Sequence, residues 1–146
     1  MNIAMHENCP HCERLQKASR GELKTLVKET ENVIVIAGDH QYFPGYCVVI
    51  SKIHVREMHS LSEAAAAAIF RDVLNVGKQI ESAYKSHKMN YVSLGNVDEH
   101  LHWHVMPRYL NDPDHRDHPW KNVQFFGEKP TTTGAIQKLK ELFSRS

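Results

Sequence analysis

Short apolar runs separated by polar turns fill the first third of the chain, and one long amphipathic stretch follows them. Residues 23–27, 33–37 and 47–50 are apolar runs of strand length, bounded by turn-forming residues, and they predict three β-strands. Ahead of them, residues 9–18 suit a short helix or turn, which Gly21 would stop.

The longest predicted element is a helix over about residues 61–85. Ser60 and Glu63 have the spacing of a capping box, in which the two side chains satisfy free backbone N–H groups at the start of a helix. Apolar side chains then recur every three or four residues, as one buried helix face requires. These side chains are Ile69, Val73, Val76, Ile80 and Tyr84.

Two more strands are predicted over residues 91–94 and 101–106, followed by a proline-containing loop and an amphipathic helix over residues 136–143. Strands that come in runs around one long helix favour an α+β fold. We expect an antiparallel sheet with the long helix and the short C-terminal helix packed on one face. The length of 146 residues, without repeats or linker-like composition, predicts a single domain over residues 1–146.

Composition argues against several classes of protein. With 18 Lys and Arg against 17 Asp and Glu, the net charge of +1 gives no long-range field for duplex nucleic acid or an anionic membrane. No apolar stretch is long enough to span a membrane and no signal-peptide pattern opens the chain, so we expect a cytoplasmic protein. Three cysteines, an odd number, argue for thiols that are free or metal-bound.

Three histidines alternate with apolar residues in the sequence His-Leu-His-Trp-His at residues 100–104. In a strand, successive side chains point to opposite faces, so His100, His102 and His104 would share one face. On a helix, residues two apart do not face each other. Two uses stay open: a metal site, because imidazole is a common ligand, or nucleophilic attack of an imidazole nitrogen on phosphorus.

The stretch His-Leu-His-Trp-His-Val-Met at residues 100–106 resembles the signature of the histidine triad (HIT) family, His-φ-His-φ-His-φ-φ with φ apolar, at all seven positions. The similarity covers roughly residues 9–120 and is closest to the bacterial branch described as diadenosine-polyphosphate hydrolase-like. The flanking stretches that carry it are 43–45 (FPG), 52–54 (KIH), 90–91 (NY), 94–96 (LGN), 107–109 (PRY) and 112–113 (DP), with Trp120.

The resemblance implies an enzyme, a nucleotide hydrolase or transferase that needs no metal for catalysis. It would cleave an α-phosphate bond of a dinucleoside polyphosphate or a nucleoside phosphoramidate. His102 would be the nucleophile that carries the nucleotidyl group, oriented by the backbone carbonyl near His100. His104 would contact the scissile phosphate and the leaving group, where a protonated imidazole stabilises developing charge.

The resemblance also implies nucleotide-binding residues. Asn96 matches a position that binds phosphate or leaving-group oxygens, and Asp39 falls near the family's ribose-binding acid, although a Gly-Asp turn explains it equally well. Arg108 could add a bidentate phosphate contact, although an arginine after a strand is more often a solvated charge. The chain departs from the family pattern at Tyr46, where many members have histidine, and at Val97, where many have serine or threonine.

Cysteines 9 and 12 form a Cys-x-x-Cys pair near the N-terminus. A redox role would require a preceding strand, for which the eight residues before Cys9 are too few and too polar. The resemblance implies instead a structural zinc ion held by Cys9, Cys12, His54 and His100. Such a closed set of four ligands would orient the triad without doing the chemistry. His11 is a competing ligand, or else a solvated surface residue.

Three functions therefore remain open. The first is the nucleotide hydrolase or transferase, the second a metallohydrolase with the triad as ligands, and the third a nucleotide-binding or scaffold protein with little turnover. The resemblance further implies a homodimer in which two sheets join into one. The base and the leaving group are not specified, because loops set specificity on a shared fold.

Overall fold

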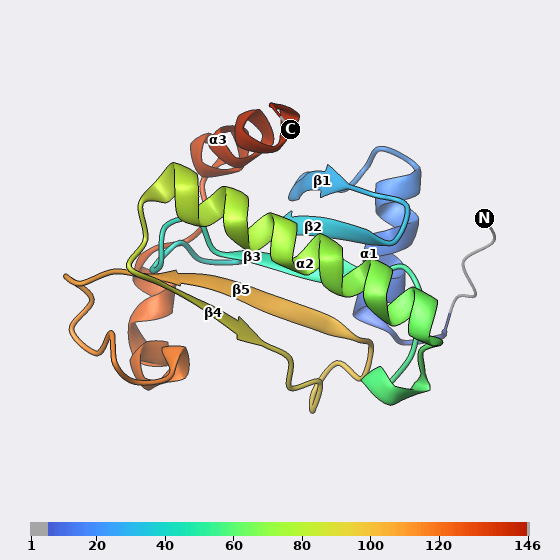
Figure 1. The fold of residues 1–146 in the computed structure, drawn as a ribbon. Coiled ribbons are helices and arrows are strands. Elements are labelled where there is room, and N and C mark those ends of the chain that lie inside the picture. The colour runs from blue at the N-terminus through green and yellow to red at the C-terminus, as the bar shows by residue number, and fades with distance from the viewer. Residues whose placement is uncertain (1–5, 146) are drawn as a thin grey trace.

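A computed structural model describes residues 6–145 and contains a five-stranded sheet in which every neighbouring pair is antiparallel. The strands are β1 (Leu26–Glu29), β2 (Val33–Ala37), β3 (Cys47–Ser51), β4 (Lys88–Val92) and β5 (His102–Arg108). Their order across the sheet is β1-β2-β3-β5-β4, which leaves β1 and β4 at the two edges (Figure 1).

Helices cover both faces of this sheet. The long α2 (Glu63–Tyr84) crosses one face and the C-terminal α3 (Thr133–Ser144) packs beside it on β1, whereas α1 (Pro10–Ser19) lies on the opposite face (Figure 1). Two 3₁₀ segments complete the described chain, η1 (Met58–Ser60) and η2 (Pro119–Glu128). The predicted α+β fold, with the long and the C-terminal helix on one face, is confirmed.

Alternate side chains of the central strands enter two separate apolar clusters. Val35 and Val49 pack under α2 and α3 together with Trp103, while Ile36 and Val48 pack against α1 on the other face. All ten residues of β2 and β3 are buried. Strands buried on both faces need continuous apolar runs, which is why their sequences do not alternate with polar residues.

The N-terminus of α2 differs from the capping prediction. Ser62, rather than Ser60, is the N-cap, and its hydroxyl accepts a hydrogen bond from the Ala65 amide at 3.2 Å. Ser60 instead ends η1. Both serines precede the same apolar pattern, but only Ser62 stands three residues before a free amide of the first turn. The predicted capping box of Ser60 and Glu63 is therefore wrong.

The observed bounds of two strands also differ from the predicted bounds, because pairing with the neighbouring strand and not local composition determines where a strand begins. β1 begins three residues later than predicted and has a register shift between Leu26 and Lys28. β4 begins at Lys88 instead of residue 91, since β5 continues to Arg108 and pairs with Lys88 there. The segment predicted as a loop after residue 113 contains η2.

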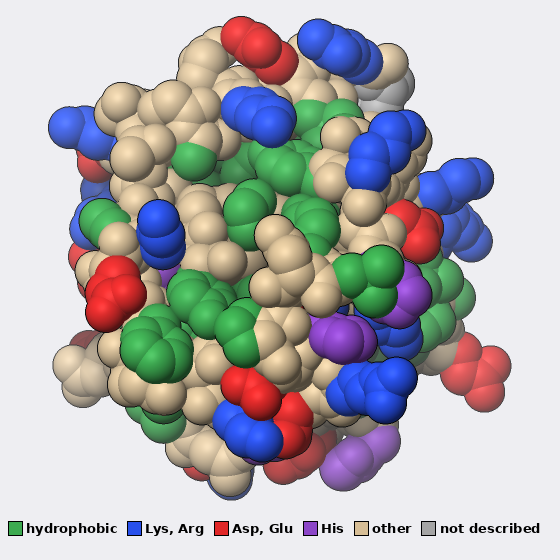
Figure 2. Space-filling model, turned by 90° about the vertical axis from the view of Figure 1, so that its left-hand side faces the viewer, with side chains coloured by type: hydrophobic (Ala, Val, Ile, Leu, Met, Phe, Trp, Pro, Cys, Tyr) green, Lys and Arg blue, Asp and Glu red, His purple; other side chains and the backbone are tan. Residues whose placement is uncertain are grey.

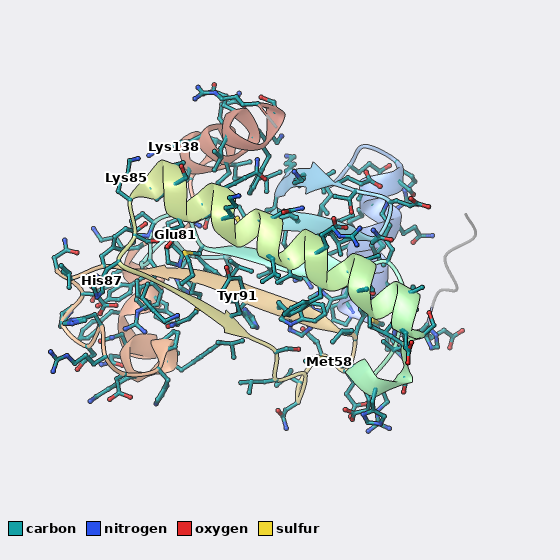
Figure 3. All side chains as sticks on the ribbon, in the orientation of Figure 1. Met58, Glu81, Lys85, His87, Tyr91 and Lys138 are labelled. Carbon is teal, nitrogen blue, oxygen red and sulfur yellow. The ribbon has the colours of Figure 1, made fainter. Side chains whose placement is uncertain are left out.

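A glycine lets α2 approach the edge strand β4 closely. Tyr91 of β4 points toward α2, where a Cβ atom on Gly77 would lie 2.0 Å from the tyrosine hydroxyl oxygen (Figure 3). Any larger residue at Gly77 would push the two elements apart. Tyr91 is still 41% exposed, so part of its ring also faces outward from the sheet edge.

Side chains of both signs are interspersed over the face shown in Figure 2, with hydrophobic groups between them. This agrees with the small net charge of +1 and with the absence of a single-sign field expected from composition. Within residues 6–145, no helix has the length and apolar character needed to cross a membrane.

Candidate active site and metal cluster

The triad histidines lie on the face of the sheet that α1 covers. In the ladder between β3 and β5, His102 pairs with Ile50 and His104 with Val48, and both partners belong to the α1-side cluster. The rings of His102 and His104 stand 5.2 Å apart between centroids. His100 precedes β5 and is fully buried.

Hydrogen bonding fixes which nitrogen of His102 carries a proton. Its Nδ1 lies 2.6 Å from the backbone carbonyl oxygen of His100. A carbonyl only accepts, so Nδ1 must donate, and in the neutral ring Nε2 then keeps its lone pair. Because His102 lines a cavity next to His104, this lone pair is the nucleophile that the triad can offer.

His104 is held by a tyrosine that the family pattern does not predict. The hydroxyl of Tyr46 lies 2.6 Å from Nδ1 of His104. Burial lowers the pKa of His104 to about 4, with the neighbouring His102 adding to the shift, and burial raises the pKa of Tyr46 above its ordinary value. The tyrosine therefore donates to a neutral imidazole, which leaves Nε2–H of His104 as an available donor.

Helix α1 adds a polar group to the cavity of His102. His11 is buried, and its ring lies 4.3 Å from the His102 ring. Arg14 donates to Nδ1 of His11 at 3.2 Å, so Nε2 carries the proton; this nitrogen is buried without a hydrogen-bond partner, 3.8 Å from Asp98. Burial, with His102 next, lowers the pKa of His11 to about 2. His11 is thus a buried site residue and not a solvated one.

The second feature of the site is a cluster of two thiols and two imidazoles, and one of the imidazoles is that of His100. Cys9 and Cys12 lie at the start of α1, His54 follows β3, and the ligand atoms of these three residues and His100 all fall within 4.8 Å of one another. Cys9 Sγ is 3.4 Å from His100 Nδ1, and Cys12 Sγ is 3.3 Å from His54 Nδ1. The two Nδ1 atoms are 3.1 Å apart.

These separations fit one tetrahedral ion. Bonds of about 2.3 Å to sulfur and about 2.0–2.1 Å to nitrogen place tetrahedral ligands about 3.6 Å apart for an S–N pair and about 3.3 Å apart for an N–N pair. Three of the four S–N distances in the cluster are 3.3, 3.4 and 3.6 Å, and the N–N distance is 3.1 Å. The four side chains could therefore hold a metal ion.

Neighbouring groups already orient the cluster. Nε2 of His100 donates to the backbone carbonyl of Ser51 at 2.7 Å, so Nδ1 presents its lone pair toward the thiols. The Cys12 amide donates to Cys9 Sγ at 3.4 Å, because Cys9 is the N-cap of α1. His11 is not part of this set of four. The structure brings the four expected ligands together. The competing residue, His11, lies beside the ring of His102 instead.

Of the three expected nucleotide-binding residues, the structure brings one to the triad. Asp39 is 92% exposed at its side chain and lines two cavities that also include His104. Asn96 is exposed and lines a different surface cavity, beside Cys9 and His54. Asn96 therefore does not line the cavity of His102, although Asp98 lines both cavities.

Arg108 holds a loop, and the expected phosphate contact is not available to it. It is fully buried, and its guanidinium donates to Asp112 at 2.6 Å, to Asn90 at 3.0 Å, and to the backbone carbonyls of Asp114 and Asp117 at 2.7 and 2.6 Å. The fork of donors that would suit a phosphate is thus used inside the protein. These partners could not be predicted, because the loop that holds most of them is irregular.

Two site residues had no functional signal in the sequence. His40 and Phe126 line a cavity on one side of His104 and come from separate parts of the chain; Trp120, which is among the residues that carry the family resemblance, lines the same cavity. The sequence could not predict His40 and Phe126, because the segment after β2 and the segment η2 come together only in the folded protein. Arg14, by contrast, stands three residues after His11, and this helical spacing could have placed both on one face of α1.

Comparison with known proteins agrees with this site. The HIT domain model matches residues 9–111. The protein Hit of Bacillus subtilis is 27% identical over 111 residues, which cover 70% of this chain and 72% of the relative. Among solved structures, a histidine triad protein from Sinorhizobium meliloti is 18% identical with a TM-score of 0.73, over 87% of this chain and 93% of the other. A HIT family protein from Bacillus anthracis is 25% identical with a TM-score of 0.62, over 95% and 96%.

The fold and the alternating imidazoles define a histidine triad protein. Because the family match covers more than half of its residues, the chain belongs to the HIT family. Membership supports a nucleotide-binding or hydrolase-type function in general.

Proposed function

We propose that this chain is a nucleotidyl hydrolase or transferase that works through a covalent intermediate on His102. The observation that carries the proposal is the hydrogen bond from His102 Nδ1 to the His100 carbonyl, which leaves Nε2 as a lone pair beside a cavity of about 280 Å³. In the first step, Nε2 attacks the α-phosphorus, the bond to the leaving group breaks, and its electron pair departs with the leaving group. Water then breaks the N–P bond and releases the nucleotide.

His104 is the proposed acid for the leaving group. A bound phosphate anion favours the protonated imidazole, because opposite charges attract in a poorly solvated site. In that state Nδ1–H of His104 donates to the Tyr46 oxygen, since a hydroxyl both donates and accepts. Nε2–H then gives its proton to the leaving group, and His104 regains a proton from the water that attacks the intermediate.

The nucleoside would extend from His102 toward Asp39. Asp39 carries an exposed carboxylate at the edge of the same cavity, and carboxylates accept hydrogen bonds from ribose hydroxyls. Arg14 and His11 line the cavity as well, and the guanidinium of Arg14 would be a donor for a phosphate oxygen.

We infer that the ion of the cysteine cluster is zinc and that it is structural. Two thiols and two imidazoles are typical zinc ligands, and four protein ligands leave no open position for water or substrate. The ion would fix the N-terminus of α1 and the carbonyl of His100, and through that carbonyl the orientation of His102. A metallohydrolase with the triad as ligands is less favoured, because the free nitrogen of His100 faces the two thiols and Nδ1 of His104 is bonded to the Tyr46 hydroxyl.

The edge strand β4 supports the expected homodimer. Apolar side chains are exposed on β4, on the loop after it and on α2 beside it, namely Tyr91, Leu94, Phe70 and Leu74. An unpaired strand edge next to apolar groups suits pairing with a second copy, which would join two sheets into one. Light scattering at micromolar concentration should report twice the mass of 16.8 kDa, and Leu94→Asp should shift it toward the monomer.

The proposed reaction is tested by AMP release from a dinucleoside tetraphosphate and from adenosine phosphoramidate, measured without EDTA and directly after EDTA is added. Wild-type protein should release AMP from at least one substrate, and His102→Ala should lose at least about 10³-fold in kcat/KM, because the nucleophile is gone. Thermal unfolding of the variant checks that the fold survives. Wild-type protein that binds AMP but releases none from either substrate would favour the nucleotide-binding alternative. Rapid loss of activity on chelation while the fold survives would favour a metallohydrolase.

A further inference from the structure

The two cysteines of the metal cluster differ in their access to solvent. Cys9 is partly exposed and lines a surface cavity of about 380 Å³, whereas Cys12 is fully buried and does not line that cavity. Neither cysteine lines the cavity of His102. A reagent that enters from solvent therefore meets the sulfur of Cys9 first, outside the proposed nucleotide site.

The start of α1 brings the two sulfur atoms close enough for a disulfide. Cys9 is the N-cap and Cys12 follows three residues later, so both side chains lie on one side of the first turn. Their Sγ atoms are within 4.8 Å of each other. Cys-x-x-Cys pairs at helix N-termini are a known setting for reactive thiols. Within residues 6–145 no strand precedes α1, so the pair is not part of a βαβ redox module, but a disulfide between the two cysteines needs none.

A disulfide and a bound ion exclude each other in this cluster. A thiolate binds metal ions, but the same sulfur in a disulfide carries no charge and is a poor ligand. Oxidation would leave His54 and His100 as ligands, whose Nδ1 atoms are 3.1 Å apart. Two ligands are too few for a structural site that needs four, so disulfide formation would release the ion.

The cluster ties the start of α1 to the sheet, and α1 depends on this tie more than the triad strand does. Without an ion, His100 keeps its bond to the Ser51 carbonyl at 2.7 Å, and β5 keeps its pairing with β3 and β4. α1 packs on the sheet through Leu15 and Ala18, which both lie beyond its first turn. Loss of the ion would therefore loosen the first turn of α1 before it disturbs β5.

α1 also carries two side chains of the cavity that holds His102. His11 and Arg14 both line this cavity. The His11 ring lies 4.3 Å from the His102 ring, and Arg14, the proposed phosphate donor, donates to Nδ1 of His11 at 3.2 Å. A shift of the first turn would therefore move both side chains relative to His102 and to the nucleotide bound beside it.

We propose that Cys9 and Cys12 form a redox-sensitive modification site, in which a reversible disulfide takes the place of the ion and weakens nucleotide binding through α1. The reagent that oxidises the pair is a small-molecule disulfide. The loss of nucleotide affinity rests on the proposed function, whereas the disulfide and the loosening of α1 do not.

The exchange balances in two steps. The Cys9 thiolate forms a bond to one sulfur of the reagent, the S–S bond of the reagent breaks, and its other half leaves as a thiolate. The Cys12 thiolate then attacks the Cys9 sulfur, the bond between Cys9 and Cys12 forms, and the second half of the reagent leaves as a thiolate. The cysteine pair is oxidised and the reagent is reduced to two thiolates, and an excess of a small dithiol reverses both steps.

The test follows zinc-loaded protein before and after incubation with oxidised glutathione. Peptide mapping should show a bond between Cys9 and Cys12 with Cys47 still a free thiol, and a colorimetric chelator should detect one zinc ion released for each disulfide formed. Hydrogen exchange should become faster in α1 and stay unchanged in α2. The affinity for AMP should fall at least about 10-fold, as expected when a hydrogen bond to a charged group is lost.

Dithiothreitol with added zinc should restore the free thiols, the bound zinc, the slow exchange of α1 and the affinity for AMP. Retention of zinc with both thiols free after oxidation would overturn the proposal. A disulfide that leaves hydrogen exchange in α1 unchanged would overturn it as well, because α1 is the element through which the site would act.

Two variants locate the response. Cys9→Asp keeps a helix-capping side chain and a zinc ligand but cannot form a disulfide, so it should hold zinc and lose the response to oxidised glutathione. Cys9→His takes its place if the aspartate variant binds no zinc. Cys47→Ala should respond as wild type does, because Cys47 lies in the apolar cluster on the other face of the sheet. Release of zinc from Cys9→Asp on oxidation would show that the disulfide is not the cause, against the proposal.

Turnover separates this site from the proposed reaction. If oxidation links the two cysteines, releases zinc and loosens α1, but the reduced protein cleaves no substrate, the proposed reaction fails while the redox site stands. If the reduced protein releases AMP from a substrate and oxidised glutathione leaves both thiols free, the redox site fails while the reaction stands.

Discussion

His100 and His102 lie two residues apart and are both nearly inaccessible, yet they face different chemistry. His100 is enclosed by the two thiols and His54, with its other nitrogen bound to the Ser51 carbonyl. His102 binds one carbonyl and keeps a lone pair beside a cavity. The difference teaches that alternating histidines on one strand need not share a task, because the elements packed around each ring decide what it can do.

The largest effect should come from removing one ligand of the cysteine cluster around His100. Cys12→Ala removes one of four proposed ligands, and we expect a loss of about 3 kcal/mol or more in the free energy of unfolding, because metal binding and folding are coupled. Cys47→Ala is the matched control: Cys47 is a buried thiol in the cluster on the opposite face of the sheet. Thermal unfolding with and without EDTA should show that chelation destabilises wild type and the control but not Cys12→Ala. Equal sensitivity of all three would contradict a structural ion.

In the cavity of His102, the substitution His104→Ala should lower kcat by about 10²- to 10³-fold, a contribution in the usual range for a general acid. Its unfolding midpoint should stay close to wild type, since His104 lies at the border of two cavities. A substrate whose leaving group needs no proton, such as a nitrophenyl ester of AMP, should be affected much less. An equal loss on both kinds of substrate would show that His104 does not protonate the leaving group.

Tyr46→Phe tests how His104 is positioned, with an expected loss of about 10-fold in kcat for the removal of one hydrogen bond to a catalytic group. The ring stays and only the hydroxyl partner of Nδ1 is lost. The pH profile of kcat should move, because the hydrogen bonds of Tyr46 to the neutral and to the protonated ring of His104 differ in strength and both are lost. Tyr109→Phe removes a tyrosine hydroxyl bonded to the Pro44 carbonyl and serves as the control. An unchanged pH profile would assign Tyr46 a packing role.

The smallest expected effect is on stability at low pH. The pKa of His104 is about 4 in the folded protein and 6.5 in a free imidazole. Between pH 4 and pH 6.5, His104 is therefore protonated in the unfolded chain and neutral in the folded chain. Its contribution to stability is complete above about pH 6.5 and is lost as the pH falls toward 4. The titratable groups that face it are His102, Asp39 and His40. Urea unfolding at pH 7 and 5.5 should show that His104→Asn loses about 1 kcal/mol less than wild type; equal losses would contradict the lowered pKa.

Local patterns predicted much of the fold. The period of the apolar positions located α2, and the continuous runs at residues 33–37 and 47–50 located β2 and β3. The bounds of β4 escaped prediction, because its register with β5 determines them. The N-cap escaped as well, since two serines compete within three residues and only packing selects Ser62.

The candidate site divides in the same way. The family resemblance implied the four residues that the structure gathers around His100, which the spacing of the two cysteines alone does not select. Arg108 was assigned to phosphate because its loop partners, which come after it in irregular chain, could not be foreseen. Tyr46 was noted only as a departure from the family pattern, and its bond to His104 depends on the pairing of β3 with β5. The cavity between His104 and η2 could not be predicted from the sequence, because it exists only where η2 returns to the sheet in the folded chain.

The most direct measurement is to find which histidine becomes covalently modified. Wild-type protein mixed with adenosine phosphoramidate, quenched within one turnover and digested, should yield a peptide that carries a nucleotidyl group on His102, with none on His100 or His104. Tandem mass spectrometry under conditions that preserve N–P bonds assigns the position. A nucleotidyl group on either of the other two histidines, or rapid AMP release without any modified peptide, would contradict the division between a structural His100 and a reactive His102.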